Sequence, residues 1–594
     1  VDEADSILID EARIPLVIAG DRDVSDVSPY RIADVVSSLE PGADWETDEN
    51  QRNVYLTDTG LTLVESMLGD VNLHDDEHYT LLTEVNQALH ARALLHRNVD
   101  YIVRDGEIEL VDEFTGRVVD DRRWPDGLQA ALEAKERLEI RPGGRILGSI
   151  SMQHFLRHYP KLSGMTATAQ AAADEFVGFY NLKVVPIPPN RPCVRDDHPD
   201  DIFTHREAKD QALVREIRTA HRAGRPVLVG TRSVEESERI EGLLSTAGFP
   251  CRVLNAKNDE LEAEIVSEAG RPGAITISTN MAGRGTDIKL GGADEEDRER
   301  VVRAGGLHVF GTNRHESRRI DQQLRGRSGR QGDPGSSKFF VSLDDDLMVR
   351  FGVDELIPEK SRPSHQTEPL SQPVIRREVD RLQRIVEGQN YGIRKNLYEY
   401  SSFVEEQRKR VQDRRMQLLS GLAHPEVCAV RSPERYLNLT AGIGSKIGAG
   451  NAAEIVREAE RAISLHHIDE EWADHLAEVA RIREGIHLVG LGGLEPLDEF
   501  RRQVGEAFEH LLETIDDRIV ETFDAVTIDE NGIDIHQAGL EGPSSTWTYL
   551  VNDQAVSALH QMLFGQGNIA TGAAASLTAG PLLLLWGIRE RMRR

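Results

Sequence analysis

The chain contains 594 residues, of which 39% are hydrophobic, a composition that is ordinary for a globular protein. Its 101 acidic and 70 basic side chains give a net charge of −31, which argues against a protein whose main task is to neutralise nucleic-acid phosphates. The three cysteines are widely spaced, so they offer neither a disulfide framework nor a zinc site made of cysteine alone, and they indicate a reducing compartment.

The chain opens on an acidic tetrad, Asp2-Glu3-Ala4-Asp5, beside an apolar stretch. Nucleotide hydrolases place such a pair of acids at the end of a strand, where the first holds Mg²⁺ through water and the second orients the attacking water. Asp2 and Glu3 are therefore candidates for these two roles. The tetrad alone does not decide the matter, because acidic clusters are also common on protein surfaces.

Residues 97–122 alternate in the manner of strands, with Asp105-Gly106 as a hairpin signal. Farther along the chain, a buried strand is expected to end in GMTAT at 164–168. Hydroxyl groups there could couple a nucleotide site to a neighbouring lobe, although a loop or a helix cap explains this short pattern equally well.

Residues 205–345 alternate helical segments with short apolar strands, which predicts βαβ units and a parallel sheet. Ligands bind such sheets at the carboxyl ends of the strands. The expected strands are 226–231, 251–256, 274–279, 306–312 and 338–343.

The segment TNMAGRGTDI follows the expected strand at 274–279. Gly285 allows the backbone to pass closely, and Arg284 supplies charge. Asp287 can accept a hydrogen bond from a ribose or orient a phosphate-binding arginine. A plain turn with an Arg–Asp pair is the alternative interpretation.

The segment from Gln323 to Arg330, QLRGRSGR, fits the sixth motif of superfamily 2 helicase-type motors. A helix would place Gln323, Arg327 and Arg330 on one side. Guanidinium groups there can stabilise a transferring phosphoryl group by roughly 10³-fold or more in rate. A solvated basic helix is the alternative, but Gly326 and Gly329 are unfavourable inside a helix.

Together the four segments follow the order of motifs II, III, V and VI of a two-lobed motor that binds ATP between its lobes. No G-x-x-x-x-G-K-[ST] phosphate loop occurs in the chain, so we expect that loop to lie before residue 1 and this chain alone to hydrolyse negligible ATP. A whole domain separates Asp2 from Thr166, and it lacks the interleaved aromatic and basic residues of single-strand nucleic-acid sites.

The last third of the chain is expected to be helical. Apolar residues recur at helical spacing from 373 to 419, which predicts a rod about 70 Å long that bridges domains. Two more amphipathic helices are expected at 453–488 and 497–525. The apolar run at 581–588 precedes four arginines and is interpreted as a frayed or surface-seeking tail, which can include contact with an anionic membrane surface.

Six segments are long and specific matches to one known family: 2–13, 105–136, 226–238, 279–292, 305–337 and 472–490. On these residues the chain resembles SecA, the ATPase motor of bacterial preprotein translocation. It departs from the family in lacking the typical Cys-rich zinc tail. A short or missing helical wing, together with the ending STWTYLVND at 545–553, is similar to the accessory, second SecA of actinobacteria.

The resemblance implies an α/β fold with two RecA-like motor lobes of the superfamily 2 helicase type, an inserted α+β peptide-binding domain and an all-α helical scaffold. The expected domains are 1–16 with 148–185 for the end of the first nucleotide-binding lobe, 17–147 for the preprotein cross-linking domain, 186–350 for the second lobe, 351–530 for the scaffold with a shortened or absent wing, and 531–594 for a mobile tail.

The same resemblance implies a motor that moves unfolded preproteins through the SecYEG membrane channel, for a subset of substrates. It would work in the cytoplasm and on the cytoplasmic face of the membrane, with ATP and Mg²⁺ as cofactors and without zinc or a specific nucleic acid; a homodimer is an open alternative to a monomer. The implied catalytic residues are Asp2, Glu3, Arg327 and Arg330, with Mg²⁺ held by Asp2 through water, and the implied nucleotide contacts are Arg284, Gly285, Asp287 and Gln323.

Two other functions fit part of the pattern. A superfamily 2 nucleic-acid helicase shares the four motifs, but it needs a basic channel that a net charge of −31 makes difficult. A binding module that holds a preprotein without turnover is compatible with the missing phosphate loop.

Overall fold

The computed structural model describes residues 1–13, 15–20, 29–47, 54–69, 71–73, 75, 78–111, 118, 122–124, 126–140, 145–255, 257, 261–279, 286–353, 362, 366–486, 495–543 and 545–551. The chain divides into two compact units. The first comprises Val1–Arg13, Ser25–Arg141 and Leu156–Lys395, and the second comprises Ile14–Val24, Pro142–Phe155 and Asn396–Arg594.

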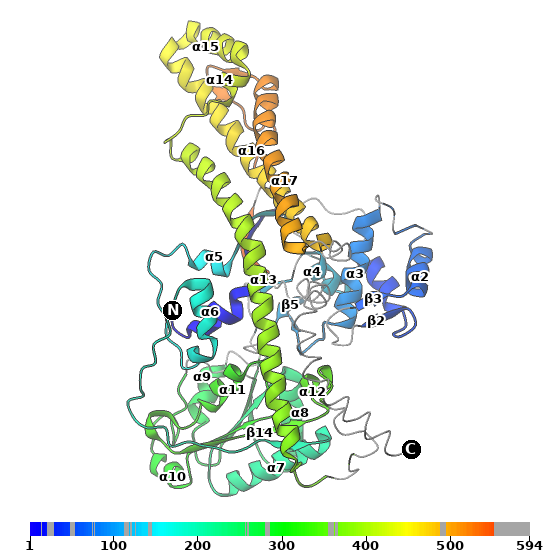
Figure 1. Ribbon diagram of the computed structural model, residues 1–594, viewed down its shortest axis with the longest axis vertical. Coiled ribbons are helices and arrows are strands. Elements are labelled where there is room, and N and C mark those ends of the chain that lie inside the picture. Colours follow the sequence, from blue (N-terminus) through cyan, green and yellow to red (C-terminus); the bar gives the residue numbers. More distant parts are fainter. Residues whose placement is uncertain are drawn as a thin grey trace. The chain divides into compact units, whose positions relative to one another are not determined.

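A parallel sheet organises much of the first unit and confirms the predicted βαβ pattern (Figure 1). Along its hydrogen-bonded path the strands follow the order β11-β12-β10-β13-β14-β8, and β9 also pairs with β14. These strands are β8 (Asp196–Asp197), β9 (Asp201–Phe203), β10 (Val227–Thr231), β11 (Arg252–Leu254), β12 (Ile275–Thr279), β13 (Leu307–Gly311) and β14 (Gly335–Ser342).

Helices cover both faces of this sheet. Successive side chains of a strand point to opposite sides, so each strand contributes to two apolar cores. Val227 and Val229 of β10 enter one apolar core, whereas Leu228 enters another. The helices are α7 (Arg206–Arg222), α8 (Val234–Thr246), α9 (Glu262–Glu268), α10 (Arg298–Arg303), α11 (Arg318–Arg325) and α12 (Asp346–Arg350). The central strands β10, β12 and β13 are buried along their whole length, as expected for a parallel sheet with two covered faces.

A smaller part of the first unit carries the acidic tetrad. It consists of short helical turns at Ser6–Asp10, Glu11–Arg13 and Ala169–Ala172, followed by α6 (Ala173–Tyr180). The hydroxyl of Tyr180 donates to the carbonyl of Leu8 over 2.8 Å and so fixes α6 to the first turn.

The inserted segment combines helices with short hairpins and matches the expected α+β type. Its helices are α1 (Pro29–Ser37), α2 (Asp58–Leu68), α3 (Tyr79–Ala93) and α4 (Asp126–Lys135), and its strands are β2 (Trp45–Thr47), β3 (Val54–Leu56), β4 (Tyr101–Arg104), β5 (Glu107–Leu110) and β6 (Arg122–Arg123). Strands β4 and β5 form the predicted hairpin, and both turn residues, Asp105 and Gly106, adopt the positive φ that such a tight turn requires.

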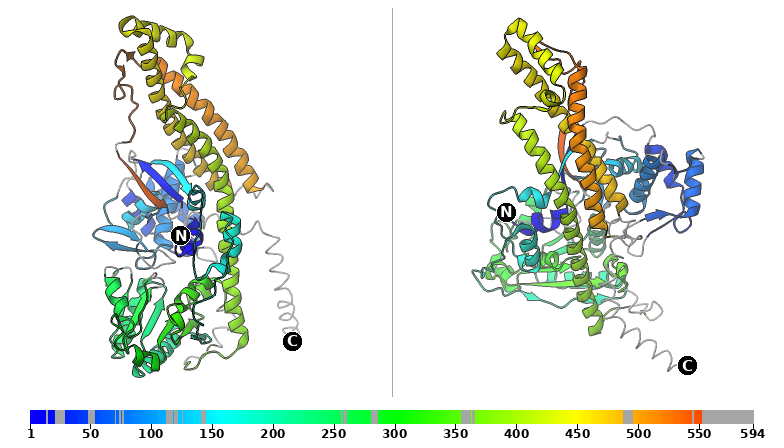
Figure 2. Two further views of the ribbon diagram at one scale, coloured as in Figure 1. Left: turned by 90° about the vertical axis from the view of Figure 1, so that its left-hand side faces the viewer. Right: turned by 45° about the horizontal axis from the view of Figure 1, so that its top comes forward.

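The second unit contains an antiparallel sheet made of segments distant in sequence. Strand β1 (Pro15–Gly20) lies between β7 (Arg145–Ser151) and β17 (Thr546–Val551), as the left view of Figure 2 shows. Strands β1 and β7 precede and follow the inserted segment, and we call β17-β1-β7 the stem sheet. The stretch 546–551 of the expected tail is therefore a paired strand, whereas 552–594 lies outside the described residues.

Long helices complete the second unit. The predicted rod is α13 (Pro373–Leu419), and its part after Asn396 belongs here with α14 (Val427–Arg431), α15 (Pro433–Ile447), α16 (Ala449–Gly485) and α17 (Pro496–Ala525). Short strands β15 (Ile528–Asp529) and β16 (Gly532–Ile533) follow, and α5 (Met152–Leu156) continues from β7. Helices α16 and α17 lie side by side (Figure 2). The predicted apolar face of α17 is buried, and Phe508 and Ile515 lie in the same core as Trp472 of α16.

Candidate functional site

The acidic tetrad and the GMTAT segment lie side by side. Asp2 and Met165 form a parallel β-bridge, in which the Ala4 amide donates to the Met165 carbonyl over 3.0 Å and the Met165 amide donates to the Val1 carbonyl over 3.0 Å. Gly164 permits this approach, because a Cβ atom there would lie only 2.6 Å from the Cβ of Ala4. Two motifs that are far apart in sequence therefore share one place in the fold.

The pair Asp2-Glu3 has the exposure and backbone geometry of a functional turn. Asp2 is exposed, and its Oδ1 accepts a hydrogen bond of 2.9 Å from the amide of Glu3. Glu3 has a φ of 50°, a left-handed conformation that is strained for a residue with a Cβ and is found preferentially at functional sites.

The donor set at this turn suits Mg²⁺, which prefers one or two carboxylates together with water and phosphate oxygens. The described residues contain no group of three or more His, Cys, Asp or Glu side chains placed to hold a metal ion. A magnesium ion at Asp2 would therefore take most of its ligands from water and nucleotide.

Asp5 joins three segments of the first unit. Its side chain is fully buried and accepts hydrogen bonds from the hydroxyl of Thr168, over 2.8 Å, from the guanidinium of Arg319 and from the amide of Gln323. Thr168 belongs to GMTAT, whereas Arg319 and Gln323 lie on α11. The predicted motifs II, III and VI therefore meet at one carboxylate.

Arg319 extends this connection to a second buried acid. Its guanidinium also donates to Asp10, so that one arginine bridges two carboxylates while only 4% of its side chain is exposed. Burial alone would lower the pKa of Arg319, but the charges of Asp10 and Asp5 and their hydrogen bonds raise it above its usual value. The arginine thus stays charged, and we call this group the Asp5–Arg319–Asp10 bridge.

The two predicted arginine sensors reach the loop that follows β12. Arg327 donates to the carbonyl of Thr286 over 3.1 Å, and Arg330 donates to the carboxylate of Asp287 over 2.8 Å. These contacts bring together three of the residues that we expected to serve the nucleotide. Arg284 and Gly285, which come just before Thr286 in the sequence, lie outside the described residues.

The expectation of one continuous helix from Gln323 to Arg330 was wrong. Helix α11 ends at Arg325, with Gly326 as its cap, and Gly329 adopts a positive φ of 71°. A side chain at position 329 would be crowded as well as strained, because its Cβ would lie 2.6 Å from the Cβ of Arg195. The glycines thus turn the chain, and the Nε of Arg330 donates back to the carbonyl of Gly326 over 3.0 Å.

A third buried carboxylate, Asp321, fixes the start of α11. Asp321 accepts hydrogen bonds from His315 Nδ1, from Arg314 and from Gln383 of α13, each over 2.7 Å. Burial alone would raise the pKa of Asp321, but these hydrogen bonds and the charge of Arg314 lower it to about 2. The ionised form of Asp321 is therefore part of the folded state.

Sequence reasoning missed Asp10, Arg319 and the partners of Asp5. One signal was available, because Arg319 lies four residues before Gln323 and so shares a helix face with it. The identity of the carboxylates on the other side could not be found in this way, since more than 300 residues separate them from Arg319.

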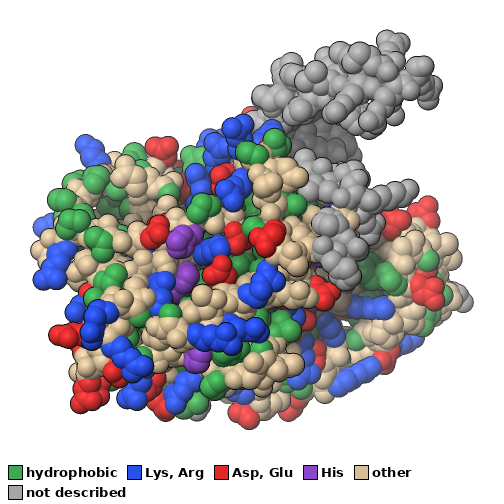
Figure 3. Space-filling model, turned by 90° about the horizontal axis from the view of Figure 1, so that it is seen from below, with side chains coloured by type: hydrophobic (Ala, Val, Ile, Leu, Met, Phe, Trp, Pro, Cys, Tyr) green, Lys and Arg blue, Asp and Glu red, His purple; other side chains and the backbone are tan. Residues whose placement is uncertain are grey.

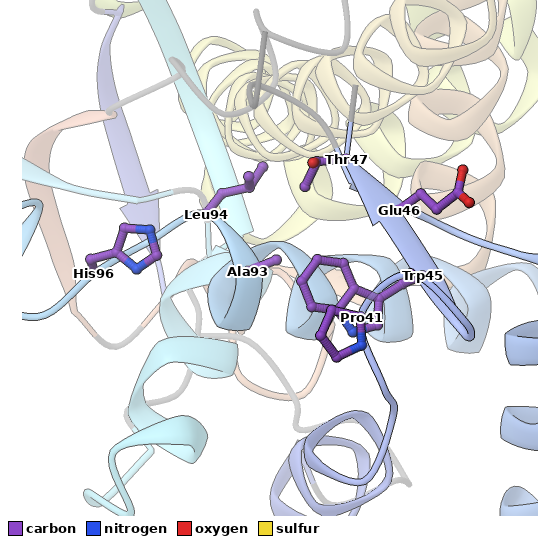
Figure 4. A pocket seen from close by; sticks show the side chains of 8 residues that line it. Pro41, Trp45, Glu46, Thr47, Ala93, Leu94 and His96 are labelled. Carbon is purple, nitrogen blue, oxygen red and sulfur yellow. The ribbon is translucent and has the colours of Figure 1, made fainter. Parts of the chain in front are cut away.

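The inserted segment carries a separate hollow of about 520 Å³, which none of the motif residues lines (Figure 4). Pro41 and Trp45 lie together on one side of it, and Ala93 and Leu94 contribute from the end of α3 and the residue after it. Its lining is mixed and offers no cluster of charges suited to a nucleotide, so the hollow is distinct from the site described above.

Among the described residues, no helix combines the length and the apolar character that crossing a bilayer requires.

Comparison with known proteins identifies the neighbours of this chain. Family models match as the SecA P-loop domain at 192–299 and 293–360, as the SecA preprotein cross-linking domain at 26–133, and as the SecA wing and scaffold domain at 369–437 and 428–527.

Full-length relatives agree with these models. The protein translocase subunit SecA 2 of Thermobifida fusca is 46% identical over 559 residues, which is 94% of this chain and 71% of that protein. SecA 2 of Corynebacterium jeikeium is 46% identical over 560 residues, with the same shares covered. The protein translocase subunit SecA of Mycobacterium avium is 45% identical over 560 residues, again 94% of this chain and 71% of the relative.

Replacing Arg319 by alanine is expected to lower the free energy of unfolding by about 3–5 kcal/mol, because two buried carboxylates then lose their counter-charge. Urea unfolding of the first unit measures this loss. Arg318→Ala is the matched control, since the neighbouring arginine binds Glu387 with 48% of its side chain exposed, and it should cost less than about 1 kcal/mol. Equal losses for the two variants would contradict the importance of the bridge.

Acid should weaken the fold through Asp321. A carboxylate whose folded pKa is depressed from 3.8 to about 2 stabilises the fold above pH 3.8 and loses that contribution as the pH falls toward 2. The contribution is about 2 kcal/mol. Urea titrations between pH 6 and pH 2 should show a steeper loss for wild type than for Asp321→Asn, while Asp346→Asn, at an exposed position, should follow wild type. Parallel profiles for wild type and Asp321→Asn would refute this role.

Proposed function

The chain belongs to the SecA family of protein translocases, and on this premise we propose how it acts as an ATP-driven motor of protein export of the accessory, SecA 2 type. ATP binds between the two lobes, and its binding and hydrolysis move unfolded preproteins through the SecYEG channel for a subset of substrates. The observation that carries this proposal is the Asp5–Arg319–Asp10 bridge, which ties the acidic tetrad to the helix of motif VI.

We assign the nucleotide chemistry to residues of motifs II, V and VI. Asp2 holds Mg²⁺ through water, and Glu3 orients the attacking water. Arg327 and Arg330 sense the terminal phosphate. Asp287 holds Arg330 in place until that phosphate binds. Arg284, Gly285 and Gln323 complete the contacts to the nucleotide. The close approach of Asp2 to Met165 and the ion pair between Arg330 and Asp287 support these assignments.

The Asp5–Arg319–Asp10 bridge connects the nucleotide site to movement of α11. Gln323 and Arg319 lie on the same helix, so a shift of α11 that brings Arg327 and Arg330 toward a phosphate also changes the contacts at Asp5. Because Asp5 and Arg319 are buried, their separation is costly unless nucleotide or water replaces the lost contacts. Nucleotide occupancy and the position of α11 are therefore linked.

The stem sheet provides an edge at which an extended polypeptide can bind. A polypeptide binds a sheet edge through main-chain hydrogen bonds, which makes this mode independent of sequence. In the stem sheet β17 pairs with one edge of β1 along five residue pairs, from Leu16↔Leu550 to Gly20↔Thr546. An unfolded preprotein can take the place of β17 there, next to the strands that lead into the inserted segment.

We propose the remaining partners on the ground of family membership. We place the motor in the cytoplasm and on the cytoplasmic face of the membrane, where SecYEG and an anionic lipid surface are available, and we keep the homodimer as a possible assembly. Both basic and acidic side chains lie on the face that Figure 3 shows. The net charge of −31 supports a protein substrate over a nucleic acid.

Catalytic turnover should be negligible for the 594-residue chain studied alone, because its sequence contains no G-x-x-x-x-G-K-[ST] loop to cradle the phosphates. A steady-state phosphate-release assay measures this. Turnover that Glu3→Gln abolishes would show instead that these residues suffice.

A SecA-type motor that also carries such a loop should hydrolyse ATP faster when membranes with SecYEG and an unfolded preprotein are both present. The physical reason is that the substrate and the channel favour the closed arrangement of the lobes in which hydrolysis takes place. Phosphate release with each component omitted in turn is the measurement. Stimulation by RNA alone, with a steep dependence on salt, would point to a helicase and overturn the proposal.

A further inference from the structure

Strand β7 is fastened to long helices of the second unit at both of its ends. It follows the inserted segment and pairs with β1 from Pro15↔Ser151 to Gly20↔Arg145, so that Arg145 marks its beginning. Any force that passes from the inserted segment along this strand must cross Arg145 first.

The guanidinium of Arg145 binds two successive turns of α16. Its Nη1 donates to the Glu470 carboxylate over 2.7 Å, and its Nη2 donates to the Glu470 carbonyl over 3.0 Å and to the Asp474 carboxylate over 2.6 Å. Glu470 and Asp474 are four residues apart and therefore lie on one face of the helix. A planar guanidinium with five donors can hold three acceptors at once, which the single ammonium of lysine does less well.

The other end of β7 is held by α13. Ser151, the last residue of the strand, shares a hydrogen bond of 2.6 Å with His154 Nδ1. The imidazole stacks on Tyr398 with ring centroids 5.1 Å apart and an angle of 4°, and its Nε2 lies 3.2 Å from the hydroxyl of Ser402. This end is held by ring stacking and by the hydrogen bonds of His154, whereas the Arg145 end is held by ion pairs.

Many arginines of the scaffold have only a local role. Arg457 pairs with Glu454, and Arg502 pairs with Glu499, each three residues away on its own helix. Such pairs stabilise one helix and connect nothing else. The contacts of Arg145 instead span 325 and 329 residues of sequence and connect a strand to a helix.

We propose that Arg145 is a positioning residue for translocation, which fixes the stem sheet to α16 so that sheet and helix move as one body. The inference rests on the proposed function, because it concerns how a polypeptide held at the sheet follows the scaffold helices. The side chain of Arg145 is 30% exposed and those of Glu470 and Asp474 are 38% and 67% exposed, so salt weakens this connection.

Amide hydrogen exchange in the 594-residue chain tests the connection without any ATP hydrolysis. Arg145→Glu should speed exchange in β1 and β7 by about fivefold, the low end of ordinary coupling effects. Reversing all three charges, with Arg145→Glu, Glu470→Arg and Asp474→Arg together, should restore protection. If Arg145→Glu acted only by disturbing packing, the charge reversal would not restore protection from exchange.

Two comparisons make the result specific. Arg457→Glu, which removes an ion pair within α16, should leave the exchange of β1 and β7 unchanged. Raising the salt to about 1 M, where the screening length is about 3 Å, should bring wild type toward Arg145→Glu. Exchange that is equal in wild type and Arg145→Glu, or that stays fast after the charge reversal, would overturn the inference.

A functional measurement separates this inference from the proposed function. In a motor that hydrolyses ATP, Arg145→Glu should lower the translocation rate by about fivefold while the KM for preprotein changes by less than about twofold, and the charge reversal should recover the rate. If wild type itself neither binds an unfolded polypeptide nor translocates it, the proposed function fails, while the exchange data still decide the role of Arg145.

Discussion

A buried ion bridge is the constraint on which the arrangement of the first unit depends. Arg319 places one guanidinium between Asp5 and Asp10, and neither acid has more than 6% of its surface exposed. Charges this far from water are tolerated only when they are paired and hydrogen-bonded. The start of the chain and α11 therefore have to stay together, and the GMTAT segment is attached to the same point through Thr168.

The periodic features of the fold could be predicted from the sequence. Alternating apolar strands and helical segments between 205 and 345 predicted a parallel sheet, and the apolar face of α17 was identified from its spacing. The turn at Asp105-Gly106 was predicted for a local physical reason, since both residues adopt the positive φ that a tight hairpin needs. Such signals lie within a few residues, and no distant part of the chain is needed to interpret them.

Features that depend on distant segments could not be predicted in this way. The stem sheet joins residues near 18, 148 and 548, and no local pattern specifies that pairing. The site was only partly predictable for the same reason. Motif members were found, namely Asp2, Glu3, Gln323, Asp287, Arg327 and Arg330, but Asp5, the carboxylate at which three of the motifs meet, was assigned no partner. The helix extended through Gly326 and Gly329 was an error of a different kind, because the identity of the motif was allowed to outweigh the low helix propensity of its glycines.

The raised pKa of Arg319 has a consequence for what can control the motor. Contacts that depend on histidine change when a compartment acidifies. The guanidinium of Arg319 instead keeps its proton over the whole physiological pH range. A change of pH in this range therefore does not open the Asp5–Arg319–Asp10 bridge by deprotonating Arg319. A competitor for the same donors, or a mechanical pull on α11, can still open the bridge. Nucleotide and preprotein can therefore control it without any change in the protonation of Arg319.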